Sequence, residues 1–280
     1  MTRRLRRAVP RILATSFMAA LYGFLFAPLV VVAGASLAGG ERPYVGFPPD
    51  RVSFEWYARI PARYVESVGL SVLLAGATAV CALALAVPAA LGLVRGRFVG
   101  REAVALLLRA PLQIPFIVVG IAFLQLYYAL GAAVGINPRG QFVGLLLGHV
   151  FLTTPYALGT VTAVLQRFNP RLEEAARTLG ATRWRTFRRV TLPVIMPGVY
   201  AGALYAFIVS FGEVPVALFL ANPRVATFPV ELFGALQFDF NPSLLAVSTL
   251  ILVLSLALIV GFQRIIGIDA LLRATAGRDP

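Results

Sequence analysis

Residues 174–193 read EAARTLGATRWRTFRRVTLP and lie in a polar connection between two long apolar stretches. Just upstream, Asn169 and Pro170 predict the N-cap and the first turn of a helix. Glu173 and its acidic neighbour place negative charge in the first turns, where the helix dipole favours it. Gly180 predicts the end of this helix, because glycine readily takes the left-handed conformation required there. A second short helix is expected to start near Thr182, so the connection predicts a helical hairpin.

The chain around this hairpin is unusually apolar. Of its 280 residues, 59% are hydrophobic and 13% are charged, and the mean hydropathy is +0.83. A soluble domain has about a quarter charged residues, so we expect an all-α integral membrane protein. Six runs lack Arg, Lys, Asp and Glu, and each reaches the roughly 20 residues that a membrane-spanning helix needs. The predicted transmembrane helices lie at about residues 12–36, 67–94, 110–132, 142–165, 194–220 and 243–264.

The arginines predict the orientation of these helices. Nineteen of the 25 lie at the two termini and in the second and fourth connections, whereas six lie in the other connections. Because basic residues concentrate on the cytoplasmic side, both termini are predicted to be cytoplasmic. A net charge of +13 also occurs in nucleic-acid-binding proteins. Here the arginines lie between apolar runs, so we predict contact with lipid and no nucleic-acid partner.

The spacing within the hairpin resembles the EAA motif of binding-protein-dependent ABC importer permeases of type I. That pattern is Glu-Ala-Ala, three residues, Gly, nine residues, Ile, one residue and Leu-Pro. The only departure is valine in place of isoleucine, a loss of one methylene that should barely affect packing. The motif falls in the fourth connection of a six-span protein, where the family has it. The matching positions are Glu174, Ala175, Ala176, Gly180, Val190, Leu192 and Pro193.

The resemblance implies a domain organisation and a set of partners. Residues 64–266 would form the ABC transporter transmembrane domain, after an amino-terminal tail, first span and external loop (1–63) and before a cytoplasmic tail (267–280). Residues 167–193 would form a coupling loop that docks on a cytoplasmic ABC ATPase dimer, whereas spacing alone allows a hairpin that merely packs on the helix ends. A second permease subunit, either a paralogue or another copy, and an external substrate-binding protein would complete the importer in a bacterial inner membrane.

Catalytic and metal-binding residues are not expected in this chain. A single histidine, His149, and a single cysteine, Cys81, cannot assemble a metal cluster or a catalytic triad. His149 is interpreted as a helix-packing residue. The sequence also lacks a Walker A phosphate loop, so ATP and Mg²⁺ are expected on the partner ATPase. A stand-alone secondary transporter would more often show two related halves and several buried charges.

The substrate is predicted from the fifth span, where Ser210 and Glu213 lie in the segment SFGEVP. A carboxylate in hydrocarbon costs several kcal/mol, so Glu213 is expected to face a water-filled path or a partner. The alternative is a helix break at this segment, with Glu213 at the outer mouth. With Asp239 before the last span, these features resemble the spermidine/putrescine-type permeases and suggest a polyamine. Iron, sulfate and molybdate importers are similar here, so these substrates remain alternatives.

Overall fold

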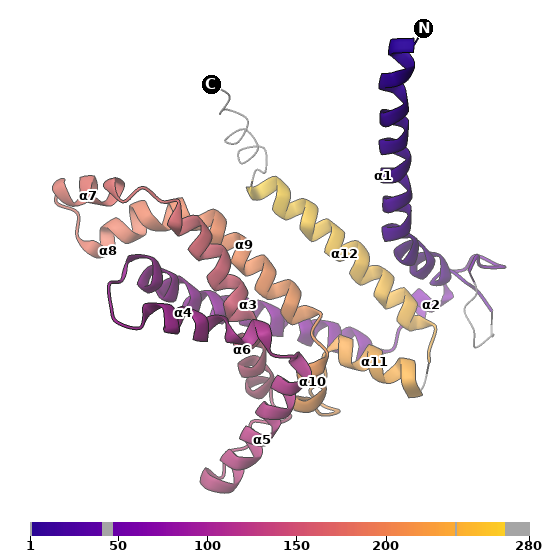
Figure 1. Ribbon diagram of the computed structural model, residues 1–280. Coiled ribbons are helices and arrows are strands. Elements are labelled where there is room, and N and C mark those ends of the chain that lie inside the picture. The colour runs from indigo at the N-terminus through magenta and orange to yellow at the C-terminus, as the bar shows by residue number, and fades with distance from the viewer. Residues whose placement is uncertain (1, 41–46, 239, 267–280) are drawn as a thin grey trace. The chain divides into compact units, whose positions relative to one another are not determined.

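The computed structural model describes residues 2–40, 47–238 and 240–266, which form helices and no strand, as the all-α prediction requires (Figure 1). Their order is α1 (Thr2–Ala35), α2 (Glu55–Ala58), α3 (Ala62–Arg95), α4 (Arg101–Arg109), the 3₁₀ helix η1 (Ala110–Gln113), α5 (Phe116–Val134), α6 (Phe142–Gln166), α7 (Arg171–Thr178), α8 (Arg183–Thr186), the π-helix η2 (Phe187–Thr191), α9 (Leu192–Phe211), α10 (Pro215–Leu220), α11 (Phe228–Phe238) and α12 (Ser243–Ile266).

Several helices are long and apolar enough to cross a membrane. Among the described residues, five reach this length: Leu13–Ala35, Ala62–Arg95, Phe116–Val134, Phe142–Gln166 and Arg183–Phe211. In α12, Ser243–Ala257 forms a shorter apolar stretch. The fifth predicted span, 194–220, is interrupted, because α9 ends at Phe211 and α10 begins only at Pro215. The orientation of the termini stays a prediction.

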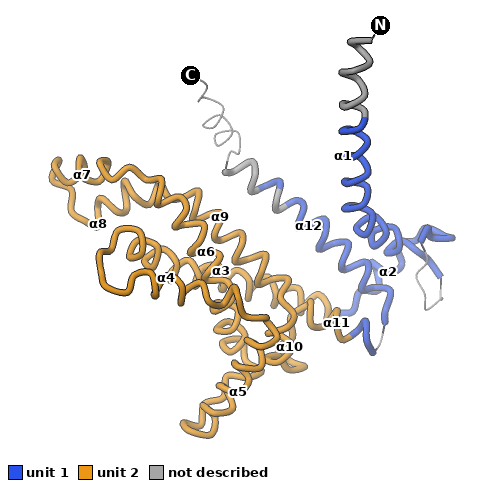
Figure 2. Tube along the Cα trace, in the orientation of Figure 1, with its two compact units in different colours: residues 1–62, 235–280 blue, residues 63–234 orange. Residues whose placement is uncertain are grey.

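The chain folds as two compact units (Figure 2). Unit 1 comprises residues 1–62 and 235–280, and within it α12 contacts α1 and α2. The single turn of α2 is tied to the end of α1, since the indole N–H of Trp56 donates to the Ala38 carbonyl at 2.8 Å. The hydroxyls of Tyr57 and Ser36 share a hydrogen bond of 2.7 Å. Unit 2 comprises residues 63–234 and contains both candidate sites described below.

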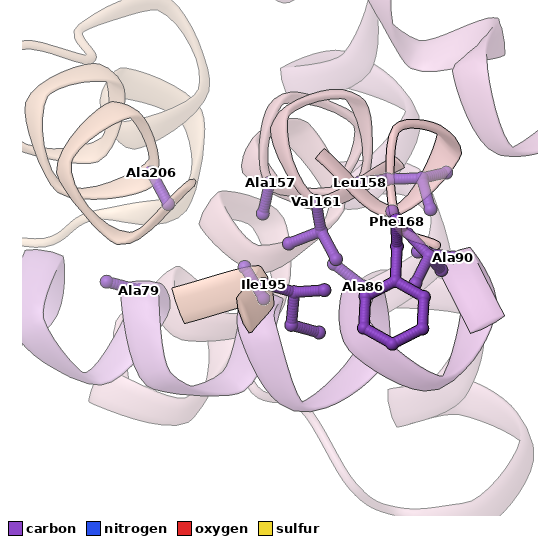
Figure 3. Packing of buried hydrophobic residues seen from close by; sticks show 11 residues of the cluster. Ala79, Ala86, Ala90, Ala157, Leu158, Val161, Phe168, Ile195 and Ala206 are labelled. Carbon is purple, nitrogen blue, oxygen red and sulfur yellow. The ribbon is translucent and has the colours of Figure 1, made fainter. Parts of the chain in front are cut away.

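One hydrophobic core of unit 2 lies between α3, α6 and α9, and we call it the small-residue core because six of its eleven buried residues are alanines (Figure 3). On α3, Ala79, Ala82, Ala86 and Ala90 recur every three or four residues, so they share one face of the helix. Glycine permits the close approach of α9 to α6, because a Cβ at Gly202 would lie 2.8 Å from the hydroxyl of Thr160. The middle of α9 is therefore packed closely onto α6.

A second core holds α10 against α5 and α6. Val216 and Leu220 of α10 are fully buried and pack with Val119 of α5 and Leu145 of α6. At Gly120 of α5, a Cβ would lie 3.1 Å from a backbone atom of α10, so the two helices meet almost backbone to backbone. This packing fixes α10 independently of α9 and keeps the interruption between them at a defined place.

Candidate functional site

The predicted hairpin is present as α7, a turn and α8. α7 starts at Arg171, slightly later than predicted, although the side-chain oxygen of Asn169 still accepts the Arg171 N–H at 3.1 Å. Gly180 has a φ of +83°, which confirms the predicted left-handed end. The hydroxyl of Thr182 then accepts the N–H of Arg185 at 3.3 Å and caps α8. α8 continues through η2 into α9, so the hairpin is joined directly to a membrane helix.

The residues of the motif at the tip of this hairpin face outward. Glu174, Ala175 and Gly180 are exposed, and no atom of the described residues lies within 4 Å of where a Cβ at Gly180 would be. Two large apolar side chains accompany them, since Leu179 is 89% exposed and Trp184 is 68% exposed. Exposed apolar side chains of this size beside small residues are typical of a protein interaction surface.

The return segment of the motif faces inward. Val190 and Leu192 pack against the small-residue core of unit 2, while Pro193 lies exposed in the first turn of α9. Ala176 of α7 is half-buried. The motif therefore has an exposed tip and, in Val190 and Leu192, an anchor at the base of α9, by which we mean its amino-terminal end.

Glu173 lies next to the motif acid but is turned into the protein. One carboxylate oxygen forms an ion pair of 2.8 Å with Arg95 at the end of α3 and accepts a hydrogen bond from the buried hydroxyl of Thr191. The other oxygen lies 3.9 Å from Arg177, one turn further along α7. The Arg95 guanidinium also lies 5.2 Å from the ring centroid of Phe168. Sequence reasoning assigned Glu173 only to the helix dipole, because nothing links it to an arginine 78 residues away.

A second buried polar site lies at the interruption between α9 and α10. Glu213 is 4% exposed, and its two oxygens accept the backbone N–H groups of Val216 and Ala217 at 2.7 and 2.8 Å. The carboxylate thus caps the first turn of α10. His149 of α6 reaches the same place, with Nδ1 2.8 Å from the hydroxyl of Ser210 and Nε2 3.8 Å from Glu213 Oε2.

The structure therefore brings together two of the three residues predicted for the substrate path. Ser210 and Glu213 lie on either side of the His149 ring, whereas Asp239 lies outside the described residues. The partner that sequence reasoning missed is His149, which is fully buried and whose Nε2 has no hydrogen-bond partner among the described residues. Its position 61 residues before Ser210 gave no signal of this contact. In the part of the chain that the structure describes, no cluster of His, Cys, Asp and Glu is suited to a metal ion.

Residues 82–267 match the family described as "Binding-protein-dependent transport system inner membrane component". The chain is 33% identical over 236 residues to the putrescine transport system permease protein PotI of Escherichia coli (strain K12), covering 82% of both chains. It is 30% identical over 255 residues to the spermidine/putrescine transport system permease protein PotC of Haemophilus influenzae, covering 90% of this chain and 96% of that one. It is also 33% identical to the sulfate transport system permease protein CysT of Escherichia coli (strain K12), over 60% of this chain and 64% of that one.

Solved structures share the fold. A chain of a bacterial ABC transporter involved in the import of the acidic polysaccharide alginate superimposes with a TM-score of 0.71 and 17% identity, covering 93% of this chain and 98% of that chain. A chain of the MetNI methionine ABC transporter gives a TM-score of 0.57 and 18% identity, with coverage of 73% and 95%.

Proposed function

We propose a substrate, partners and site residues for this chain, which belongs to the family of binding-protein-dependent transport system inner membrane components. The chain is a permease subunit of a type I ABC importer and a multi-pass membrane protein, most similar to polyamine permeases. In our proposal it forms the path for a small polycation of the spermidine or putrescine kind across a bacterial inner membrane. An external binding protein delivers the substrate, and a second permease subunit completes the path.

The observation that carries the substrate proposal is the extent of the similarity to polyamine permeases. Relatives named for putrescine and spermidine align with 82% and 90% of this chain, whereas the sulfate relative aligns with 60%. Sulfate is the second candidate, because that shorter alignment reaches the same 33% identity. The two substrates have opposite charge, so a path that suits one should exclude the other.

Glu213 and Ser210 are our proposed path residues. A carboxylate offers about four acceptor positions, and the backbone N–H groups of α10 occupy two of them. Glu213 therefore retains acceptor capacity for a cation, but a substrate reaches it only if the buried cluster opens during transport. Asp239 stays in the proposal as an acid that precedes α12.

The exposed tip of the hairpin is our proposed docking surface for a separate ATPase chain. Its support is the combination of exposed motif residues with the exposed side chains of Leu179 and Trp184. ATP and Mg²⁺ belong to that ATPase chain in this proposal, and this chain supplies no catalytic group.

Uptake by the reconstituted importer tests the function. The complete complex, in proteoliposomes loaded with ATP, is supplied with its binding protein and with labelled putrescine, spermidine, sulfate or a ferric chelate. We expect ATP-dependent uptake of a polyamine and none of sulfate. Uptake of sulfate or the chelate alone would reject the polyamine, and the absence of any ATPase chain from the purified complex would reject the docking surface.

A further inference from the structure

Two adjacent glutamates in α7 face opposite ways. Glu174, the acid of the motif, is exposed, whereas Glu173 is 7% exposed. A buried carboxylate is costly unless it is paired and hydrogen-bonded, and Glu173 is both. The exposed carboxylate of Glu174 can contact a partner, whereas the contacts of the Glu173 carboxylate lie within this chain.

The contacts of Glu173 join three elements. Its carboxylate binds Arg95, the last residue of α3, and Thr191, the last residue of η2 at the base of α9. Arg95 is itself held against Phe168, which follows α6 and is buried in the small-residue core. One side chain on α7 thus contacts the predicted cytoplasmic-side ends of two membrane helices, α3 and α9, and is linked through Arg95 to the end of α6.

The rest of α7 is attached more loosely. It is linked to α8 by a turn centred on Gly180, a residue whose backbone has wide conformational freedom. Glu173 is the only buried residue of α7, and both Leu172 and Leu179, which follows the helix, are exposed. The neighbouring η2 is a π-helix, a form that is frequent at functional sites and is less regular than an α-helix. A force applied to the exposed tip would therefore rotate α7 unless an interior contact resisted it.

We propose that Glu173 is the positioning residue that fixes α7 to the ends of α3 and α9, so that movement of the docked tip is passed to the membrane helices. This inference rests on the proposed docking of an ATPase chain, but it does not depend on which substrate is transported. Glu173 itself contacts neither substrate nor ATPase. Its loss should separate docking from transport, whereas loss of a motif residue should impair docking itself.

The test compares Glu173→Gln, Arg95→Gln and the double variant in the reconstituted importer, with Glu102→Gln as a control. Glu102 is an exposed acid on α4 that makes no ion pair among the described residues. The measurements are copurification of the ATPase chain and substrate transported per ATP hydrolysed. We expect copurification to persist in every variant and transport per ATP to fall about fivefold or more in Glu173→Gln, the lower end of typical coupling between sites. Glu102→Gln should match the wild type.

The double variant separates positioning from general destabilisation. If Glu173 acts through Arg95, the double variant should be no worse than the more impaired single variant, because both changes remove the same interaction. Multiplicative losses would overturn the proposal, as would wild-type transport per ATP in Glu173→Gln. Should Glu173→Gln fail to assemble, Thr191→Val removes one contact and keeps the carboxylate. An assembled Thr191→Val complex should then show reduced transport per ATP, and a wild-type value would overturn the proposal.

These outcomes are distinct from failure of the proposed function. If the wild-type chain copurifies with no ATPase, the docking proposal fails. If the wild-type complex transports any solute at the expense of ATP and Glu173→Gln does so equally well, only the positioning role fails.

Discussion

A buried carboxylate lies beside each end of α9, and the two have contrasting surroundings. Glu173, beside the base of the helix, pairs with arginine side chains and lies under an exposed surface. Glu213, beyond the other end, is held by backbone N–H groups and faces a buried histidine. The helix between them has 20 residues, which span about 30 Å at 1.5 Å per residue. In unit 2, α7 and α8 lie at one end and α10 lies toward the other (Figures 1 and 2).

This difference indicates that the two ends of α9 have different roles. The side-chain contacts of Glu173 tie α7 to two other elements, whereas an acid that caps a helix fixes only the local backbone. The base of α9 is therefore suited to transmit movement. The interruption at its far end is suited to keep a defined shape against α5 and α6.

The largest effect is expected from labelling the two ends from outside the cell. In a Cys81→Ala background, Pro223→Cys should react with a membrane-impermeant thiol reagent added to intact cells, whereas Thr182→Cys should not. Both positions are exposed in the structure, so a difference in labelling reports the side of the membrane. Permeabilised cells provide the control, because both cysteines should then react. Labelling of Thr182→Cys in intact cells would reverse the orientation predicted from the arginines.

A large effect is also expected at the turn of the hairpin. The φ of +83° at Gly180 is unfavourable for a β-branched residue, so Gly180→Val should strain the turn by about 1 to 3 kcal/mol. The variant should insert normally but lose stimulated ATP hydrolysis and transport. No atom of the described residues crowds this position, so within this chain the strain comes from the backbone. Gly180→Asn is the matched control and should retain more activity, since asparagine tolerates left-handed conformations. Equal coupling in wild type and Gly180→Val would contradict the docking turn.

The sequence could predict the local features of the two sites, Glu213 and Ser210 included, but not their contacts with residues far away in the chain. The helix ends around Gly180 and Thr182 follow local rules of capping, and both are found. The contact of Glu173 with Arg95, and that of His149 with Ser210, join residues 78 and 61 positions apart, and no local rule encodes such pairs.

The division of the fifth predicted span has the same explanation. Hydropathy alone continues across Gly212, and the sequence left open whether the helix breaks there. The position of α10 depends on the packing of Val216 and Leu220 against α5 and α6, which are distant in sequence. Hydropathy describes single residues and cannot predict such packing. Once α10 is fixed by that packing, Glu213 is needed to satisfy its first N–H groups.

The smallest effect is expected for Glu213→Gln, which tests the far end of α9. Glutamine offers one acceptor oxygen where the carboxylate uses two, so one N–H of α10 loses its partner at a cost of about 1 to 3 kcal/mol. The midpoint of thermal unfolding of the detergent-solubilised complex should fall, while the ATPase chain should still copurify because its proposed docking surface lies at the opposite end. If Glu213 also attracts a cation in the path, polyamine uptake per folded complex should fall severalfold, whereas Ser210→Ala should lower it less because it removes no charge. A lower unfolding midpoint with unchanged uptake would leave Glu213 as the cap of α10 and remove it from the path, and an unchanged midpoint would contradict the capping role itself.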